Sequence, residues 1–411
     1  MKRSVLVLGA GMVGTCTAVH LALRGHEVTL VDRLEPGRET SYGNAGIIQR
    51  EAVEPYPFPQ EWMVLARAVF KRGAAVSYHL AALPSLAWAL GGYWSNSRPA
   101  RYRVISQAHA RLIEHALAGH QQLIGQAAAE DLVRREGYRF VFRDPKSMEK
   151  SLTQAEALAA SHGVRHQVLD TEALSRAEPG LRSRLAGAIH WLDPWTVSDP
   201  GALVERYVRL LERTGGRLAL GDALTLRQKG SGWSVQAHGG AIEAEHTVVA
   251  LGPWSETLLR TLGYRYPLFV KRGYHLHYQG GTAPRLPAYD VDGGYVLAPM
   301  RQGVRLTTGA EFARIGAPAT PVQLSRAQVL ARQLFELREP VESRPWMGAR
   351  PCTADMLPVI GPAPRHRGLW FNFGHAHQGF TLGPVSGQLM AQLLEGGPTV
   401  VDAQPYAPTR F

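Results

Sequence analysis

The segment 1–32 restricts the fold of this chain more than any other part, because it joins a strand, a glycine-rich turn, a helix and a second strand in that order. Val5–Leu8 is an apolar run of strand length, and it leads directly into the G-x-G-x-x-G turn Gly9–Gly14. A helical stretch continues to Arg24, and a second apolar strand, Glu27–Val31, ends at Asp32. This order predicts a βαβ unit that binds a dinucleotide.

Each glycine of the turn has a separate physical role in such a unit. Gly9 lets the chain turn tightly, Gly11 lets the backbone approach a pyrophosphate, and Gly14 lets helix and strand pack closely. The phosphates lie on the free N–H groups at the start of the helix, where the helix dipole favours negative charge. Asp32, at the end of the second strand, is placed to accept hydrogen bonds from ribose hydroxyls.

Length and composition indicate a globular protein of two domains. The 411 residues carry a net charge of +11, but basic residues are spread along the chain and no nucleic-acid-binding motif is present. The charge therefore favours an anionic substrate or an anionic membrane surface. Two cysteines make no disulfide framework, and Lys2 and Arg3 do not begin a signal peptide, so we expect a cytoplasmic protein.

No uninterrupted apolar run reaches the roughly 18 residues that a spanning helix needs. The most apolar region, Trp62–Trp94, contains charges, a proline and three glycines. We expect a pair of buried helices there, with peripheral contact to the inner face of a membrane as the alternative.

Hydrophobic periodicity predicts the remaining elements. Helices are expected over about 60–130, 149–162 and 199–214. Strands are expected at 138–142, at 217–220, three times between 223 and 246, at 247–251, and within 264–280 and 289–312. Residues 344–411 are expected to form a glycine-rich loop and a helix.

This order predicts an α/β protein with an α+β cap. We expect a Rossmann-like domain made of segments 1–52, 196–263 and 344–411. The inserted cap, a mixed β-sheet with helices that binds the substrate, comprises 53–195 and 264–343.

Five motifs in the chain resemble those of one family. They are Gly9–Gly14, Thr40–Gly46, Val248–Ser255, Gly348–Pro351 followed by Asp355, Pro358, Ile360 and Gly361, and Gly374–Gly379. In this order they resemble the D-amino-acid dehydrogenases, within the group that includes glycine oxidase, D-amino-acid oxidase and monomeric sarcosine oxidase. The resemblance implies an FAD-binding fold of the D-amino-acid oxidase and glutathione reductase type.

The resemblance also implies where FAD binds, with the start of a helix near the pyrimidine edge of the flavin. The expected cofactor-binding residues are Gly9, Gly11, Met12, Val13, Gly14, Asp32, Arg33, Thr40, Ser41, Asn44, Ala45, Gly46, Ala223, Gly252, Gly374, His375, Gly379, Phe380 and Thr381. Sarcosine oxidase attaches its flavin through a cysteine at the position that Gly348 occupies here, so we expect FAD to be non-covalent.

For the substrate, the resemblance gives Arg350 the role of binding a carboxylate, which a planar guanidinium does through two parallel hydrogen bonds. Tyr295 is expected to help Arg350, Tyr274 to lie in the roof of the pocket, and His377 to tune specificity. His375 and His377 form H-x-H, but no cysteine pair or carboxylate nearby completes a metal site, so no metal is expected.

The expected reaction is oxidation of a D-amino acid at its Cα–N bond, giving an imino acid that water hydrolyses to a 2-oxo acid and ammonia. A secondary amine such as D-proline, D-hydroxyproline, sarcosine or an opine is an alternative substrate, and so is a role as one subunit of a hetero-oligomer. With a single dinucleotide fingerprint, electrons leave to oxygen, a quinone or a partner protein.

Overall fold

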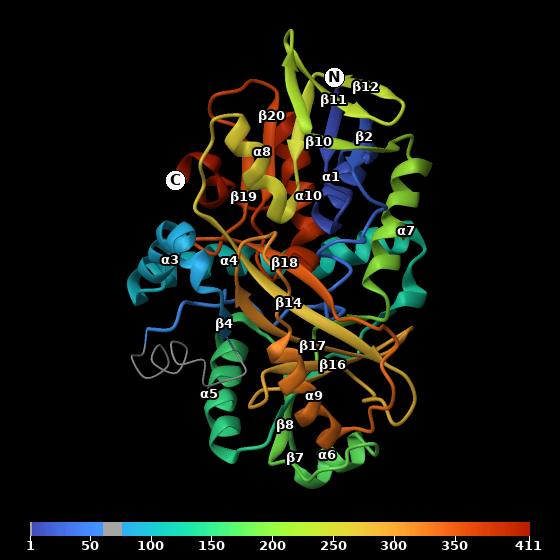
Figure 1. The fold of residues 1–411 in the computed structure, drawn as a ribbon, viewed down its shortest axis with the longest axis vertical. Coiled ribbons are helices and arrows are strands. Elements are labelled where there is room, and N and C mark those ends of the chain that lie inside the picture. Colours follow the sequence, from blue (N-terminus) through green and yellow to red (C-terminus); the bar gives the residue numbers. More distant parts are fainter. Residues whose placement is uncertain (1, 61–75) are drawn as a thin grey trace.

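The chain builds two large β-sheets, and Figure 1 shows the sheet that contains the N-terminal segment above the other. The computed structural model describes residues 2–60 and 76–411. The upper sheet has the order β12-β11-β10-β2-β1-β13-β20-β19. Its strands are β1 Ser4–Leu8, β2 Glu27–Asp32, β10 Arg217–Lys229, β11 Gly232–Ala237, β12 Gly240–Ala244, β13 His246–Val249, β19 Val359–Pro362 and β20 Leu369–Phe373.

The centre of the upper sheet is parallel, from β10 through β2, β1 and β13 to β20. Helices α1 (Met12–Leu23) and α10 (Gly379–Glu395) pack on each other beside it (Figure 1). Gly387 makes this approach possible, because an added Cβ would lie 2.7 Å from the backbone of Cys16. The other helices near this sheet are α7 Pro200–Arg213 and α8 Ser255–Thr261.

The lower sheet has the order β18-β14-β17-β16-β15-β6-β8-β7, and β4 pairs with β17. Its strands are β4 Val76–Tyr78, β6 Tyr138–Phe142, β7 His166–Asp170, β8 Gly187–Trp191, β14 Leu268–Tyr278, β15 Ala288–Asp290, β16 Tyr295–Met300, β17 Gly303–Phe312 and β18 Trp346–Thr353. The helices are α3 Leu83–Asn96, α4 Pro99–Ala127, α5 Pro145–His162, α6 Thr171–Ala177 and α9 Val322–Leu334. A small third sheet joins β3 Ile47–Ile48, β9 Trp195–Val197 and β5 Val133–Arg134.

The expected fold class is confirmed, and three local expectations are corrected. Residues 76–78 form β4 within a region expected to be helical, because they pair with the edge of β17. Residues 346–353, expected to be a loop, form β18, because they pair with β14 along its length. Of the region 62–94, expected to be buried helices, residues 62–75 lie outside the described residues, and α3 buries only Leu86, Ala89 and Tyr93.

We propose the expected division into domains with one change. Every strand of the upper sheet comes from 1–52, 196–263 or 344–411, and every strand of the lower sheet except β18 comes from 53–195 or 264–343. The strand β18 therefore belongs with the cap. Among the described helices, none is long and apolar enough to cross a membrane.

Candidate active site

A glycine turn and the start of α1 form one end of the site. Gly9 has φ +108°, and an added Cβ would lie 2.5 Å from the carbonyl oxygen of Ala250, so only glycine fits there. Gly11 precedes the helix without a side-chain cap, and the Met12 N–H donates to Ser41 Oγ at 2.9 Å. The remaining N–H groups at this helix start suit an anion such as a pyrophosphate.

Asp32 holds the glycine turn in place. Its carboxylate accepts hydrogen bonds from the backbone N–H groups of Ala10, at 2.6 Å, and Leu34, at 3.2 Å. Beside it, the Arg33 guanidinium lies 4.4 Å from the centre of the Trp254 ring and pairs with Glu39 at 2.7 Å. These groups order the end of β2 next to the helix start.

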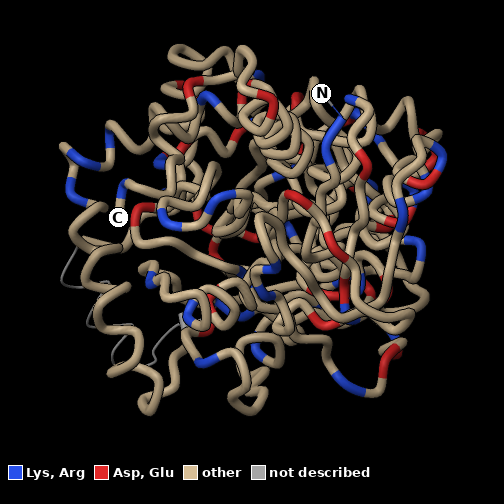
Figure 2. Tube along the Cα trace, turned by 90° about the horizontal axis from the view of Figure 1, so that it is seen from above, with Lys and Arg blue, Asp and Glu red and all other residues tan. Residues whose placement is uncertain are grey.

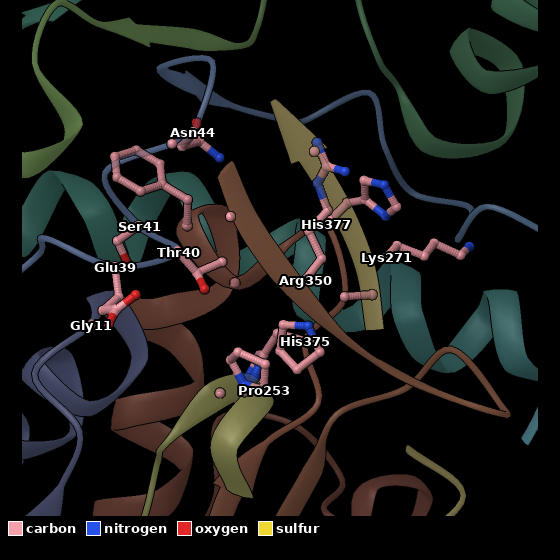
Figure 3. A pocket seen from close by; sticks show the side chains of 18 of the residues that line it. Gly11, Glu39, Thr40, Ser41, Asn44, Pro253, Lys271, Arg350, His375 and His377 are labelled. Carbon is pink, nitrogen blue, oxygen red and sulfur yellow. The ribbon is translucent and has the colours of Figure 1, made fainter. Parts of the chain in front are cut away.

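A cavity of about 630 Å³ runs from this turn to the lower sheet, and Figure 3 shows part of its lining. Its volume is within the range of roughly 300–1,000 Å³ typical of ligand sites. Most of the residues expected to bind the cofactor line it: Gly9, Gly11, Met12, Val13, Asp32, Arg33, Thr40, Ser41, Asn44, Ala45, Ala223, Gly252, Gly374, His375, Gly379 and Phe380.

Three of the expected cofactor residues do not line the cavity. Gly14 faces the turn, where an added Cβ would lie 1.8 Å from the Gly9 carbonyl oxygen. The Gly46 N–H donates to Asn44 Oδ1 at 2.8 Å, and the Thr381 hydroxyl accepts from the Gln49 N–H at 3.1 Å. All three support the residues around the cavity.

Arg350, on β18, lines the cavity on the side of the lower sheet. Its Nη1 donates to the Gly309 carbonyl oxygen at 2.9 Å, and its guanidinium lies against Gly273, where an added Cβ would be 2.6 Å from Nη2. Burial lowers the pKa of Arg350. Its guanidinium makes no ion pair with a described residue, so it faces the cavity as an uncompensated cation.

The structure places one of the two predicted tyrosines at the cavity. The Tyr295 ring lines it, and its hydroxyl accepts a hydrogen bond from Arg143 Nη2 at 3.2 Å. Tyr274 does not line the cavity, because alternation along β14 directs it to the other face, where its hydroxyl donates to Glu311 at 2.6 Å.

The two histidines of the H-x-H motif are both neutral groups beside the cavity. His375 Nε2 lies 2.9 Å from Ser386 Oγ, and burial lowers its pKa to about 3. Burial, Arg350 and Lys271 together hold the pKa of His377 well below its usual value. The His377 ring lies 5.1 Å from the ring of Tyr56, which also lines the cavity.

Within the described residues, the one His/Glu group with spacing for a metal lies elsewhere, at His275, His277 and Glu342. Its atoms are already engaged: Arg305 Nε donates to His277 Nε2 at 2.9 Å, which leaves the proton on Nδ1, beside Glu342. This arrangement favours a hydrogen-bonded chain over a metal site.

Sequence reasoning missed Lys271 and Tyr56 as cavity residues. Lys271 follows the alternation of β14 that also puts Gly273 on the cavity side, so the strand pattern contained a signal for it. Tyr56 lies in a proline-rich stretch without periodicity, and only the tertiary fold brings it to the cavity.

Comparison with known proteins identifies the family. A family model described as FAD dependent oxidoreductase matches residues 4–393. This chain belongs to that family. It is 32% identical to a D-amino acid dehydrogenase of Rhizobium johnstonii, over 99% of each protein, and 30% identical to a D-amino-acid oxidase of Bradyrhizobium diazoefficiens, over 100% of this chain and 99% of the relative. The crystal structure of glycine oxidase from Geobacillus kaustophilus has the same fold, with a TM-score of 0.72, 22% identity and full coverage of both chains.

The cofactor of this oxidoreductase is FAD, and the cavity fits it. The glycine turn leaves room beside the start of α1 for a pyrophosphate, and the cavity continues from there to the lower sheet as an extended cofactor requires. When bound, FAD supplies an acceptor for the two electrons and the hydrogen that leave the substrate.

Proposed function

We propose that this enzyme oxidises a D-amino acid at its Cα–N bond. The observation that carries the proposal is Arg350, a guanidinium that lines the cavity and has no acidic partner among the described residues. A carboxylate fits this group through two charge-assisted hydrogen bonds. The D configuration is supported by the relatives named as D-amino acid dehydrogenase and D-amino-acid oxidase.

In this proposal the chain acts mainly by positioning its substrate. Gly309 and Gly273 fix the Arg350 guanidinium, and the guanidinium fixes the carboxylate so that the Cα hydrogen faces the cofactor end of the cavity. The substrate binds with a neutral amine and loses a hydride from Cα, which leaves a protonated imino acid. Water then hydrolyses the imino acid to a 2-oxo acid and ammonia, and no general base is required.

The test is anaerobic mixing of the purified protein with a panel of D-amino acids, L-amino acids and imino acids, followed by flavin absorbance. Bleaching by D-amino acids with formation of 2-oxo acid and ammonia supports the proposal. Bleaching only by secondary amines, with a cyclic imine as product from D-proline, supports the alternative substrate class. No bleaching by any amino acid, with reduction by dithionite intact, contradicts an amino-acid substrate.

We also propose that FAD is held without a covalent bond. Gly348 stands at the position where the resemblance places an attaching cysteine, and Cys352 is buried within β18. Acid denaturation should therefore release all of the flavin into the supernatant. Flavin that precipitates with the protein contradicts non-covalent binding.

The electron acceptor is oxygen, a quinone or a partner protein, because the sequence contains one dinucleotide fingerprint and no second site for a nicotinamide cofactor. Reoxidation of the substrate-reduced protein distinguishes these acceptors. Fast reoxidation by air identifies an oxidase, and fast reoxidation by a soluble quinone with slow reaction in air identifies a dehydrogenase.

For a quinone acceptor we propose peripheral contact with an anionic membrane. The segment before and within α3, at one side of the molecule in Figure 1, exposes Leu80 (69%), Trp88 (63%) and Trp94 (41%), and Arg98 lies over the Trp94 ring. In Figure 2, Lys and Arg are interspersed with Asp and Glu over most of the described chain. Aromatic residues beside arginine suit a lipid interface.

Cosedimentation with phosphatidylglycerol vesicles tests this contact. Replacing Leu80 and Trp88 by Ser should abolish binding, whereas Val329→Ser, at an exposed position on α9, should not change it. Equal binding by the two variants places the contact elsewhere or excludes it.

A further inference from the structure

A second cation, Lys271, faces the same cavity as Arg350. Its side chain is 93% buried, and its Nζ donates to the Tyr93 hydroxyl at 2.8 Å. The amine also lies 4.4 Å from the centre of the Tyr93 ring, 5.6 Å from that of Phe269 and 5.7 Å from that of Phe312. These contacts hold the ammonium in one place, but none of them supplies a negative charge.

Two other buried cations of this sheet, Arg272 and Arg139, are paired with carboxylates, whereas Arg305 donates to His277 and to the backbone carbonyl oxygens of Tyr42 and Asn44. Arg272, the residue after Lys271, is completely buried and bonds Glu311 at 2.7 Å, and Arg139 pairs with Glu178. Neither Lys271 nor Arg350 has an acidic partner in the part of the chain that the structure describes. Because a charge removed from water without a partner is costly, the buried Lys271 and the half-buried Arg350 at one end of a cavity indicate an anionic ligand.

The strand pairing makes this cost larger. Lys271 and Arg350 are directly opposite each other in the antiparallel pair of β14 and β18, so both side chains lie on one face of the sheet. Like charges at such positions repel. Three acidic residues line the cavity: Asp32, Glu39 and Asp222. They belong to the segments around the glycine turn and the upper sheet, and they do not pair with Lys271 or Arg350.

The backbones of Lys271 and Arg350 are paired, but the charged ends of their side chains point in different directions. The Arg350 guanidinium lies over Gly273 and bonds Gly309, whereas the Lys271 amine extends toward Tyr93 on α3. Figure 3 shows the amine of Lys271 directed away from Arg350, with His377 beside them. A hollow of about 20 Å³ adjoins Lys271 between Tyr56 and Phe269, which is room for about one water-sized group.

We propose that the substrate carries a second acid group and that Lys271 binds it while Arg350 binds the α-carboxylate. The substrate class is therefore an amino acid with two carboxylates, placed either on the side chain, as in an acidic D-amino acid, or on the amine, as in an imino diacid. This inference rests on the proposed function, since it assigns the α-carboxylate to Arg350.

Two arrangements of the second acid share this chemistry, and matched substrates separate them. D-glutamate and D-aspartate carry it on the side chain, with D-glutamine and D-asparagine as neutral controls of nearly equal shape. Iminodiacetate carries it on the amine, with sarcosine as the neutral control. Flavin reduction under anaerobic conditions gives kcat/KM for each member of a pair.

For the wild-type protein we expect one acid to exceed its neutral control by roughly 10²-fold in kcat/KM, as for a charge-assisted hydrogen bond in a water-poor site. Lys271→Met should remove this preference by lowering activity on the acid alone. Lys271→Arg should retain part of it, and Lys150→Met, at an exposed position on α5, should not affect it.

Equilibrium binding gives a readout that does not depend on turnover. Glutarate, with two carboxylates, should perturb the flavin spectrum of the FAD-loaded protein at a concentration roughly 10²-fold lower than butyrate, with one. Lys271→Met should make the two ligands bind alike. If this variant does not fold, the wild-type comparisons of glutamate with glutamine and of glutarate with butyrate decide the question.

The failures of the two proposals are distinguishable. If neutral and acidic D-amino acids are oxidised equally, or if Lys271→Met lowers activity on both to the same extent, the role of Lys271 is contradicted and the proposed function stands. If no amino acid or imino acid reduces the flavin, the proposed function fails, and equal binding of glutarate and butyrate then contradicts the role of Lys271 as well.

Discussion

The cavity has a nucleotide end, at the glycine turn, and a substrate end, at β14 and β18. The residues of the first lie close together in the sequence, and those of the second lie far apart. The nucleotide end is built mainly from 9–14 and 32–46, neighbouring segments in which a few side chains fix the backbone. The substrate end combines Arg350, Lys271, Tyr56 and His377 from distant segments. Their positions depend on the register of β14 with β18. The glycine-turn end of the cofactor site is therefore a local property of the sequence, whereas the end at β14 and β18 is a property of strand pairing.

Replacement of Gly11 tests the nucleotide end of the cavity and should have the largest effect. Gly11→Val should lower the affinity for FAD by more than about 10²-fold, because a branched side chain at Gly11 occupies the space beside the helix start where the pyrophosphate lies. The measurement is the flavin content of the purified protein and its titration with FAD. Gly239→Val, at a turn where an added Cβ meets nothing within 4 Å, is the control. Normal FAD binding by Gly11→Val would place the pyrophosphate elsewhere.

Replacement of Arg350 tests the substrate end of the cavity and should have the next largest effect. Arg350→Ala should lower kcat/KM for the best substrate by roughly 10²-fold or more, because the carboxylate loses both binding and alignment. Arg350→Lys should recover only part, since an ammonium lacks the planar fork. Flavin content should stay the same, and Arg344→Ala, at an exposed position before β18, should behave as the wild type. Loss of FAD from Arg350→Ala would show that this strand supports the cofactor instead.

A smaller effect follows from the charge of Lys271. Burial lowers its pKa from 10.5, and the groups that face it are Tyr93, Arg350, Cys352 and His377. Because the ammonium binds the second acid, preference for an acidic substrate over its amide is complete below this pKa and is lost as pH rises through it. The ratio of the two kcat/KM values against pH measures this, since the α-amine titrates in both substrates. A ratio that rises with pH contradicts it.

The smallest effect concerns Tyr295, whose hydroxyl either supports the lower sheet through Arg143 or contacts the substrate. Its hydroxyl is bonded to Arg143, which in turn bonds Asp290 at 2.8 Å. Tyr295→Phe should therefore cost about 1 kcal/mol of stability and change kcat/KM by less than about threefold. Thermal unfolding and steady-state kinetics check both values. A fall near 10²-fold with unchanged Tm means that the hydroxyl contacts the substrate after all.

The sequence predicted the nucleotide end well because its signals are local. The spacing of Gly9, Gly11 and Asp32 is enough to specify strand, turn and helix, and β1, α1 and β2 begin and end within a residue or two of the expected positions. Arg350 was singled out through its motif, and its role in binding the substrate stays a prediction. Lys271 was missed because its importance comes from its position opposite Arg350, and β18 itself was expected to be a loop.

The expectation for Tyr274 failed for a related reason. The tyrosine follows Gly273 on β14, and a shift of one residue along a strand moves a side chain to the other face of the sheet. When the partner strands of β14 are not known, its sequence does not determine which of its two faces lines the cavity. The pairing with β17 and β18 decides this, and it directs Tyr274 to Glu311.

The opposed pair Lys271 and Arg350 also bears on how the reaction ends. Oxidation and hydrolysis convert an acidic D-amino acid into a 2-oxo acid, which keeps both carboxylates but loses its nitrogen as ammonia. In the proposed binding mode, both cations contact this product as they contact the substrate. We therefore predict that departure of the 2-oxo acid is slow and that accumulated product inhibits the enzyme in competition with fresh substrate.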